Sequence, residues 1–200
     1  MSNKKVVNKR LDSTKKYIDA LQDKYSKLNV VRVDLSYKKP YSDDITLDDA
    51  NNHFNRMLNN RRSKPSIFDN QVGYICKKEY TKDKGMHFHT IFFYDGQKIK
   101  NDTNKAIAIG KYWKEDITEK KGSYHNCNIK AKKEYGDKNG VGMLEHKDIE
   151  KRKNLDIAVN YLCKDDGKQD IAPVKSNMND RAFARGRMPS PKSNMGRPRT

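Results

Sequence analysis

Residues 74–95, YICKKEYTKDKGMHFHTIFFYD, contain the pattern around which the rest of the chain is organised. They predict two strands joined by a short loop over 81–85, and the second strand carries the triplet His87-Phe88-His89. Residues two apart on a strand share a face, whereas on a helix they diverge by about 200°. The two imidazoles therefore point the same way and form the beginning of a metal site.

The loop length determines whether a carboxylate joins the two imidazoles. With a five-residue loop, Tyr80 pairs with Met86, and Glu79 lies opposite His87 on the face that both imidazoles share. A four-residue loop would shift the register by one residue and turn Glu79 to the opposite face. The first register predicts Glu79, His87 and His89 as metal ligands. In the alternative, the histidines are ordinary strand residues and Glu79 balances nearby lysines.

The composition favours an anionic partner. The 200 residues include 43 Lys and Arg against 26 Asp and Glu, a formal net charge of +17. Such a charge is typical of proteins that bind phosphate backbones. A membrane surface is also anionic, but an apolar run of about 18 residues is missing, so we expect no membrane partner. The sequence shows no signal-peptide pattern and no C-x-x-C pair, which predicts reduced thiols and a cytoplasmic location.

Hydrophobic periodicity around the hairpin predicts an α+β fold, with a central, mostly antiparallel sheet of about five strands and packed helices. Besides the hairpin, strands are expected over 30–39, 124–132 and 141–146, and helices over 13–28, 47–62, 106–113 and from 149 or 154 to 164. Thr46 is the expected N-cap of the second helix, because Asp49 completes a capping-box pattern. The buried stripe of that helix would be Leu47, Ala50, Phe54, Met57 and Leu58.

Three regions are expected along the chain. Residues 1–28 form a basic N-terminal extension, mobile over 1–10, and a helix; residues 29–172 form the main domain, which contains the candidate metal ligands. Residues 173–200 form a basic tail, whose last twenty residues hold five arginines and one lysine without an acidic residue. That composition is typical of a disordered segment available to nucleic acid.

The pattern Tyr-x-x-Lys offers a nucleophile to act beside the metal. It occurs at 74/77, 135/138 and 161/164, but only Tyr161 and Lys164 lie on a predicted helix, where residues three apart are neighbours. A lysine there can favour the phenolate of a tyrosine, which is a poor nucleophile when protonated. With a divalent cation to polarise a phosphate, the combination predicts phosphotyrosine-forming cleavage of a nucleic-acid strand. The alternative is that Tyr161 is a core residue of an amphipathic helix.

Two segments resemble the HUH endonucleases, namely GMHFHTIFF at 85–93 and YLCK at 161–164. The resemblance is closer to the single-tyrosine replication initiators of filamentous phages, prophages and small plasmids. The segments GYICKKEY, GKYW, SYHNCN and AVNYLCK are similar to that group as well, and the resemblance covers roughly residues 29–188.

The resemblance implies Mg²⁺ or Mn²⁺ bound by His87, His89 and Glu79. It also implies that Tyr161 is the nucleophile and Lys164 its helper. Such enzymes nick single-stranded or hairpin DNA at an origin, keep the 5′ phosphate on tyrosine and release a 3′-OH for rolling-circle replication. A host helicase and polymerase would be further partners.

Basic, aromatic and amide side chains are candidates for DNA contacts: Lys38, Lys39, Arg61, Arg62, Tyr124, His125, Asn126, Arg185 and Arg187. For residues 124–126, a polar turn beside a strand is an equally good interpretation. The reaction class also leaves alternatives: a mobilisation relaxase or transposase with the same chemistry, a metal-dependent hydrolase that uses activated water, or a non-enzymatic DNA-binding regulator.

Overall fold

One antiparallel sheet of six strands runs through the molecule; the computed structural model describes residues 3–164, 171, 174–175 and 181–191. The strand order is β4-β1-β3-β2-β6, and β5 pairs with β1 along the same edge as β4. The strands are β1 (Lys27–Tyr37), β2 (Gln71–Thr81), β3 (Gly85–Asp95), β4 (Gly122–Asn126), β5 (Gly142–Glu145) and β6 (Phe183–Arg185). The α+β class is confirmed, with one strand more than expected.

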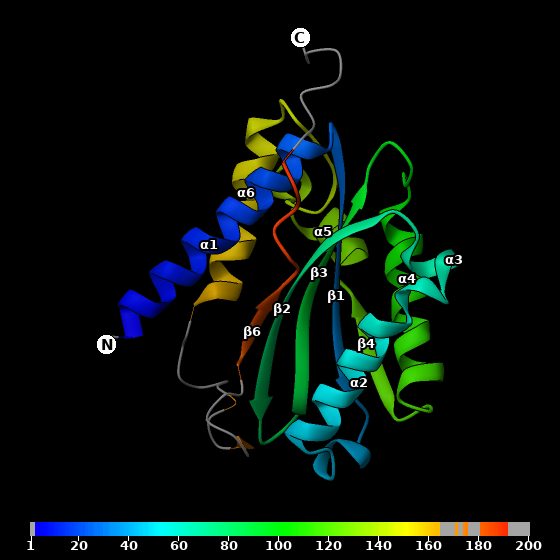
Figure 1. Ribbon diagram of the computed structural model, residues 1–200. Helices are drawn as coiled ribbons and strands as arrows, with labels where there is room; N and C mark the ends of the chain where they lie inside the picture. Colours follow the sequence, from blue (N-terminus) through cyan, green and yellow to red (C-terminus); the bar gives the residue numbers. More distant parts are fainter. Residues whose placement is uncertain (1–2, 165–170, 172–173, 176–180, 192–200) are drawn as a thin grey trace.

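Helices cover both faces of the sheet (Figure 1). On one face, α1 (Asn3–Lys24) and α6 (Ile149–Cys163) lie side by side. The other face packs against α2 (Leu47–Asn59), α3 (Pro65–Phe68) and α4 (Asp102–Tyr112), while α5 (Cys127–Glu134) lies against β1. Short 3₁₀ turns occupy Tyr41–Asp43, Asn60–Arg62 and Gly136–Lys138, and a π turn, Trp113–Ile117, follows α4.

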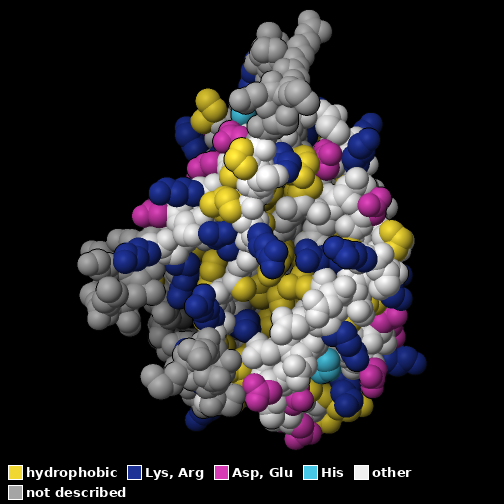
Figure 2. Space-filling view, in the orientation of Figure 1, with side chains coloured by type: hydrophobic (Ala, Val, Ile, Leu, Met, Phe, Trp, Pro, Cys, Tyr) yellow, Lys and Arg dark blue, Asp and Glu magenta, His cyan; other side chains and the backbone are white. Residues whose placement is uncertain are grey.

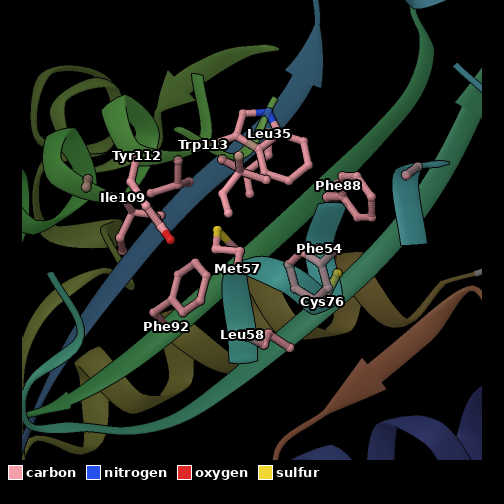
Figure 3. Close-up of a cluster of buried hydrophobic side chains, with 14 of the residues drawn as sticks. Leu35, Phe54, Met57, Leu58, Cys76, Phe88, Phe92, Ile109, Tyr112 and Trp113 are labelled. Carbon is pink, nitrogen blue, oxygen red and sulfur yellow. The ribbon is translucent and has the colours of Figure 1, made fainter. Parts of the chain in front are cut away.

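The central strand β3 is apolar on both faces for most of its length. Phe88 and Phe92 face the layer of α2 and α4 (Figure 3), and Ile91 faces the layer of α1 and α6. Toward the hairpin, however, the positions that follow Ile91 on its face are His89 and His87. The helical layer of α1 and α6 therefore gives way to a polar surface at this end of the sheet.

The second helix agrees closely with its sequence pattern. Thr46 is the N-cap: its hydroxyl accepts a hydrogen bond from the Asp49 amide, and the Asp49 carboxylate accepts one from the Thr46 amide. The five expected stripe residues are all buried. The helix ends at Asn59 rather than 62, because the last residues tighten into the 3₁₀ turn.

The first helix begins earlier and ends earlier than expected. Residues 1–10 were expected to be mobile, but α1 begins at Asn3 and runs without Gly or Pro to Lys24. Tyr17, Ile18 and Leu21 are fully buried and anchor it. Once this turn is packed, each further residue adds a hydrogen bond at low cost, so the helix propagates toward the N-terminus.

The region expected as a strand over 124–132 changes structure after Asn126. The Asn126 side chain accepts hydrogen bonds from the amides of Asn128 and Ile129 and thereby starts α5. Asn128 is fully buried, accepts a bond from the Arg32 amide and donates one to the Val30 carbonyl. Its amide group satisfies the edge of β1 between β5 and β4, which favours a helix here over a continuous strand.

A strand also forms in the region expected to be a disordered tail. β6 pairs with the outer edge of β2, placing Phe183 opposite Lys77 and Arg185 opposite Ile75. An unpaired edge strand presents free amide and carbonyl groups, and β6 satisfies them. The prediction of disorder is therefore wrong for this segment; residues 173, 176–180 and 192–200 of the expected tail lie outside the described residues. Within the described ranges, no helix is long and apolar enough to cross a membrane.

Candidate metal centre and tyrosine site

The hairpin adopts the register that the five-residue loop predicts. Tyr80 pairs with Met86, and Glu79 pairs with His87. Gly85 closes the loop with φ +65°, and a Cβ there would overlap the Ser42 carbonyl oxygen, so the turn requires glycine. This local geometry fixes which side chains share the polar face.

Glu79, His87 and His89 converge as the sequence predicts. One ligand atom from each lies within 4.8 Å of the others. The Nε2 atoms of His87 and His89 lie 3.4 and 3.0 Å from Glu79 Oε2, and the rings are nearly perpendicular, at 89°. The cluster can hold a metal ion.

The other ring nitrogen of each histidine faces a protein oxygen. His87 Nδ1 lies 3.0 Å from the Gly85 carbonyl oxygen, and His89 Nδ1 lies 2.9 Å from Asp34 Oδ2, although the latter contact lacks the alignment of a good hydrogen bond. Such outer contacts orient the imidazoles of metal sites and hold the proton on Nδ1. Both Nε2 atoms are thereby directed to the same point, which is the arrangement that a metal requires.

Sequence reasoning missed Asp34. It lies on β1 directly opposite His89, between the buried Val33 and Leu35. The sequence pattern that could have indicated it is a charged residue in the middle of an alternating apolar strand, because its side chain must point to the face opposite that of Val33 and Leu35. Only the pairing of β1 with β3 shows which histidine it contacts.

The charges of the cluster are strongly coupled. Burial disfavours the charged form of Glu79, but hydrogen bonds from His87, His89 and Lys77 outweigh it and hold the pKa of Glu79 far below its usual range. Burial also disfavours the charged form of His89, yet the carboxylates of Asp34 and Glu79 raise the pKa of His89 to about 9. Without metal, the cluster is therefore an anionic carboxylate pair with a protonated imidazole between them.

Lys77 connects this cluster to the helix that carries the candidate tyrosine. Its Nζ lies 2.5 Å from Glu79 Oε1 and donates a hydrogen bond of 2.9 Å to the Lys164 carbonyl. Lys77 is 7% exposed, so both contacts are shielded from water. The ammonium group also neutralises part of the negative end of the α6 dipole. The last turn of α6 thus lies one lysine side chain away from the metal ligands.

Tyr161 is 61% exposed and is not a core residue. The helix buries Leu155, Val159 and Leu162 instead. Lys164 is the C-cap of α6. Its φ of −65° is still helical, so its Cβ lies one turn after Tyr161. Its ψ of 144° is extended, so the following chain leaves the helix axis. The other two Tyr-x-x-Lys pairs lie on β2 and after α5.

Three candidates for DNA contacts surround the start of α5. The ring of Tyr124 packs on Gly110, where a Cβ would overlap it. Asn126 is the N-cap of α5, and its amide nitrogen also donates to the Thr103 carbonyl. Both side chains are thus used within the fold. His125 is exposed and lies opposite Asp34 on the polar face.

The basic candidates lie in three places. Lys38 and Lys39 follow β1, and Lys39 forms an ion pair with Asp43. Arg61 and Arg62 lie in the turn after α2, and both are exposed. The third place is β6, where Arg185 is half-buried, with the exposed Arg187 two residues further on.

Most of the sequence matches a known protein family. The family described as the YagK/YfjJ C-terminal domain matches residues 1–178. The chain belongs to this family. No curated protein and no solved structure matches the sequence. The family match spans α1 through α6 and includes every residue of the metal cluster.

Proposed function

We propose that this chain nicks and rejoins single-stranded DNA at a replication origin, with Tyr161 as the nucleophile. The observation that carries the proposal is the bridge through Lys77: it joins the Glu79 ligand to the last turn of α6, where Tyr161 is exposed. A metal cluster and an accessible phenol at the end of a rigid helix are the parts that phosphotyrosine chemistry needs. The formal net charge of +17 suits a polyanionic substrate.

Glu79, His87 and His89 would hold the cation. Two imidazoles and one carboxylate are compatible with Mn²⁺ or Mg²⁺, and both Nε2 atoms are oriented by contacts at Nδ1. When bound, the cation would supply Lewis-acid polarisation of the scissile phosphate.

The reaction exchanges one phosphoester bond for another. Tyr161 Oη forms a bond to phosphorus as the bond from phosphorus to the 3′ oxygen breaks. The phenolic proton passes to solvent and the leaving 3′ oxygen takes a proton from water, so the products are a 5′ phosphotyrosine and a free 3′-OH. Lys164, one turn after Tyr161, would offset the negative charge of the phosphate through its own positive charge. Attack by a 3′-OH on the phosphotyrosine reverses the step and rejoins the strand.

The test is adduct formation with a labelled library of single-stranded oligonucleotides, in Mn²⁺ or in EDTA. Wild type and Tyr161→Phe are compared with Tyr135→Phe, a matched control because Tyr135 is also exposed, at 54%, and also precedes a lysine by three residues. We expect a Mn²⁺-dependent covalent adduct in wild type and in the control, and none in Tyr161→Phe.

Two results would refute the nicking mechanism and identify an alternative. Mn²⁺-dependent cleavage that survives in Tyr161→Phe would indicate hydrolysis by activated water. Salt-sensitive DNA binding without cleavage under any condition would indicate a DNA-binding regulator, which the charge alone supports. The adduct assay does not separate a replication initiator from a relaxase or a transposase; strand-discharge assays on origin and transfer sequences would.

A further inference from the structure

A basic groove lies between α1 and the edge strand β6. Its lining includes Arg10, Ser13, Lys78, Arg181, Phe183 and Arg185. Arg10, Arg181 and Arg185 carry a positive charge, while the ammonium group of Lys78 donates a hydrogen bond to Asn51 of α2; the described residues that line the groove include no acid. Figure 2 shows Lys and Arg side chains gathered on the face in view, around the positions that α1 and β6 occupy in Figure 1. We call this surface the α1–β6 groove.

Arg185 is held in the groove by contacts that leave donor capacity. Its guanidinium lies 5.1 Å from the centroid of the Tyr17 ring. Nε and Nη2 donate to Ser13 Oγ at 3.3 and 3.0 Å, and Nη1 donates to the Gly186 carbonyl at 3.1 Å. Arginine has five N–H donors, so these three bonds to described residues leave capacity for a phosphate oxygen. The stacked, bonded side chain loses little further freedom on binding.

Arg10 links the groove to the candidate tyrosine site. Its guanidinium lies 5.5 Å from the centroid of the Phe183 ring, and Nη1 lies 3.4 Å from the Cys163 carbonyl oxygen. Cys163 is the last residue of α6, two residues after Tyr161. The residue opposite Phe183 on β2 is Lys77, which bonds the next carbonyl of that helix end. One end of the groove therefore abuts the last turn of α6.

We propose that the α1–β6 groove binds the sugar–phosphate backbone of single-stranded DNA and leads that strand to the end of α6. Charge complementarity selects a polyanion, and two arginines already oriented by aromatic rings suit phosphate oxygens. A neighbouring hollow with Lys9 and Lys16, beside Asp12, continues the basic surface along α1. The assignment of this strand as the one that is cut rests on the proposed function; the binding itself does not.

Binding is tested with fluorescein-labelled dT20, which has no secondary structure and needs no origin sequence. All measurements use the full chain in EDTA, with Tyr161→Phe as the background, so that no cleavage contributes. Fluorescence anisotropy gives the dissociation constant across a series of NaCl concentrations. The test variant is the double Arg10→Gln/Arg185→Gln. The control is Lys130→Gln/Lys133→Gln, which removes the same charge from α5, at the opposite edge of the sheet.

We expect the groove variant to bind dT20 at least about tenfold more weakly. The slope of log affinity against log salt concentration should also become shallower by about 1.4, because each of the two lost phosphate contacts on a single strand contributes about 0.7 to that slope. The control is expected to bind within about twofold of the parent. Equal losses in both variants would overturn the proposal, because the effect would then be general charge. Tighter binding of a 20-base-pair duplex than of dT20 through the same two arginines would overturn the single-stranded occupant.

A second measurement removes any dependence on how the variant folds, since Arg185 packs on Tyr17. Oligo-dT carrying 5-iodouracil is photo-cross-linked to the unmutated groove, and the modified peptides are identified by mass spectrometry. Cross-links on peptides containing Phe183 or α1 support the groove; cross-links confined to other segments contradict it. Because neither measurement involves cleavage, failure of the nicking mechanism and failure of the groove are distinguishable.

Discussion

Replacement of Lys77 with methionine is expected to destabilise the protein by about 3 kcal/mol. The Lys77 and Glu79 side chains are 9% and 4% exposed and lie 2.5 Å apart, so loss of the ammonium leaves a buried carboxylate with one fewer counter-charge. Removing one partner of a buried pair typically costs about 3–5 kcal/mol. We expect a cost at the lower end of this range, because Glu79 Oε2 keeps its contact of 3.0 Å with His89 Nε2 in the variant.

The assay is urea denaturation in EDTA at pH 7, arranged as a double-mutant cycle with Glu79→Gln. The two single variants should not add: the double variant is expected to cost about 2–3 kcal/mol less than their sum, because each substitution removes the charge that the other leaves unpaired. Saturating Mn²⁺ should reduce the cost of Lys77→Met, since a bound cation supplies positive charge beside Glu79.

The matched control is the exposed pair of Lys27 and Glu145, which lie 2.8 Å apart with side chains 37% and 57% exposed. The same cycle there should give a coupling energy below about 1 kcal/mol, because water screens both charges. Additive costs at Lys77 and Glu79, or equal coupling energies in the two cycles, would show that burial does not strengthen the Lys77 bridge.

Three further predictions address the cluster and the fold. Because the folded pKa of His89 is raised to about 9, the metal-free protein should lose stability as pH rises from about 6.5 through 9. The apparent Mn²⁺ affinity, measured by calorimetry, should rise over pH 7–9 by up to about tenfold per pH unit, because one proton must leave His89 before the metal binds. At pH 9, where proton competition at His89 is small, Asp34→Asn should weaken Mn²⁺ binding about 10–100-fold while leaving the circular dichroism spectrum unchanged; unaltered affinity would contradict its orienting role. Thr46→Ala should cost about 1 kcal/mol in urea denaturation, since it removes the cap of α2, and no loss would mean that the capping box is not stabilising.

Local patterns in the sequence determined the hairpin and the second helix. Loop length together with the two-residue period of a strand places Glu79 opposite His87, and the contacts involve residues close in sequence. Thr46 and Asp49 similarly mark the start of α2, because capping involves only neighbouring residues. Local patterns do not decide whether Tyr161 is exposed or buried, because its helix has little apolar asymmetry to orient it.

Tertiary structure alone decided what surrounds the cluster. Asp34 reaches His89 through the pairing of β1 with β3, and Lys77 reaches the end of α6 across 87 residues of sequence. The strand β6 forms because β2 has a free edge, and Asn128 caps a gap between two strands that pair with β1. Each of these contacts satisfies a buried charge or an unpaired backbone group that exists only after the sheet has assembled, and no periodicity along the chain encodes it.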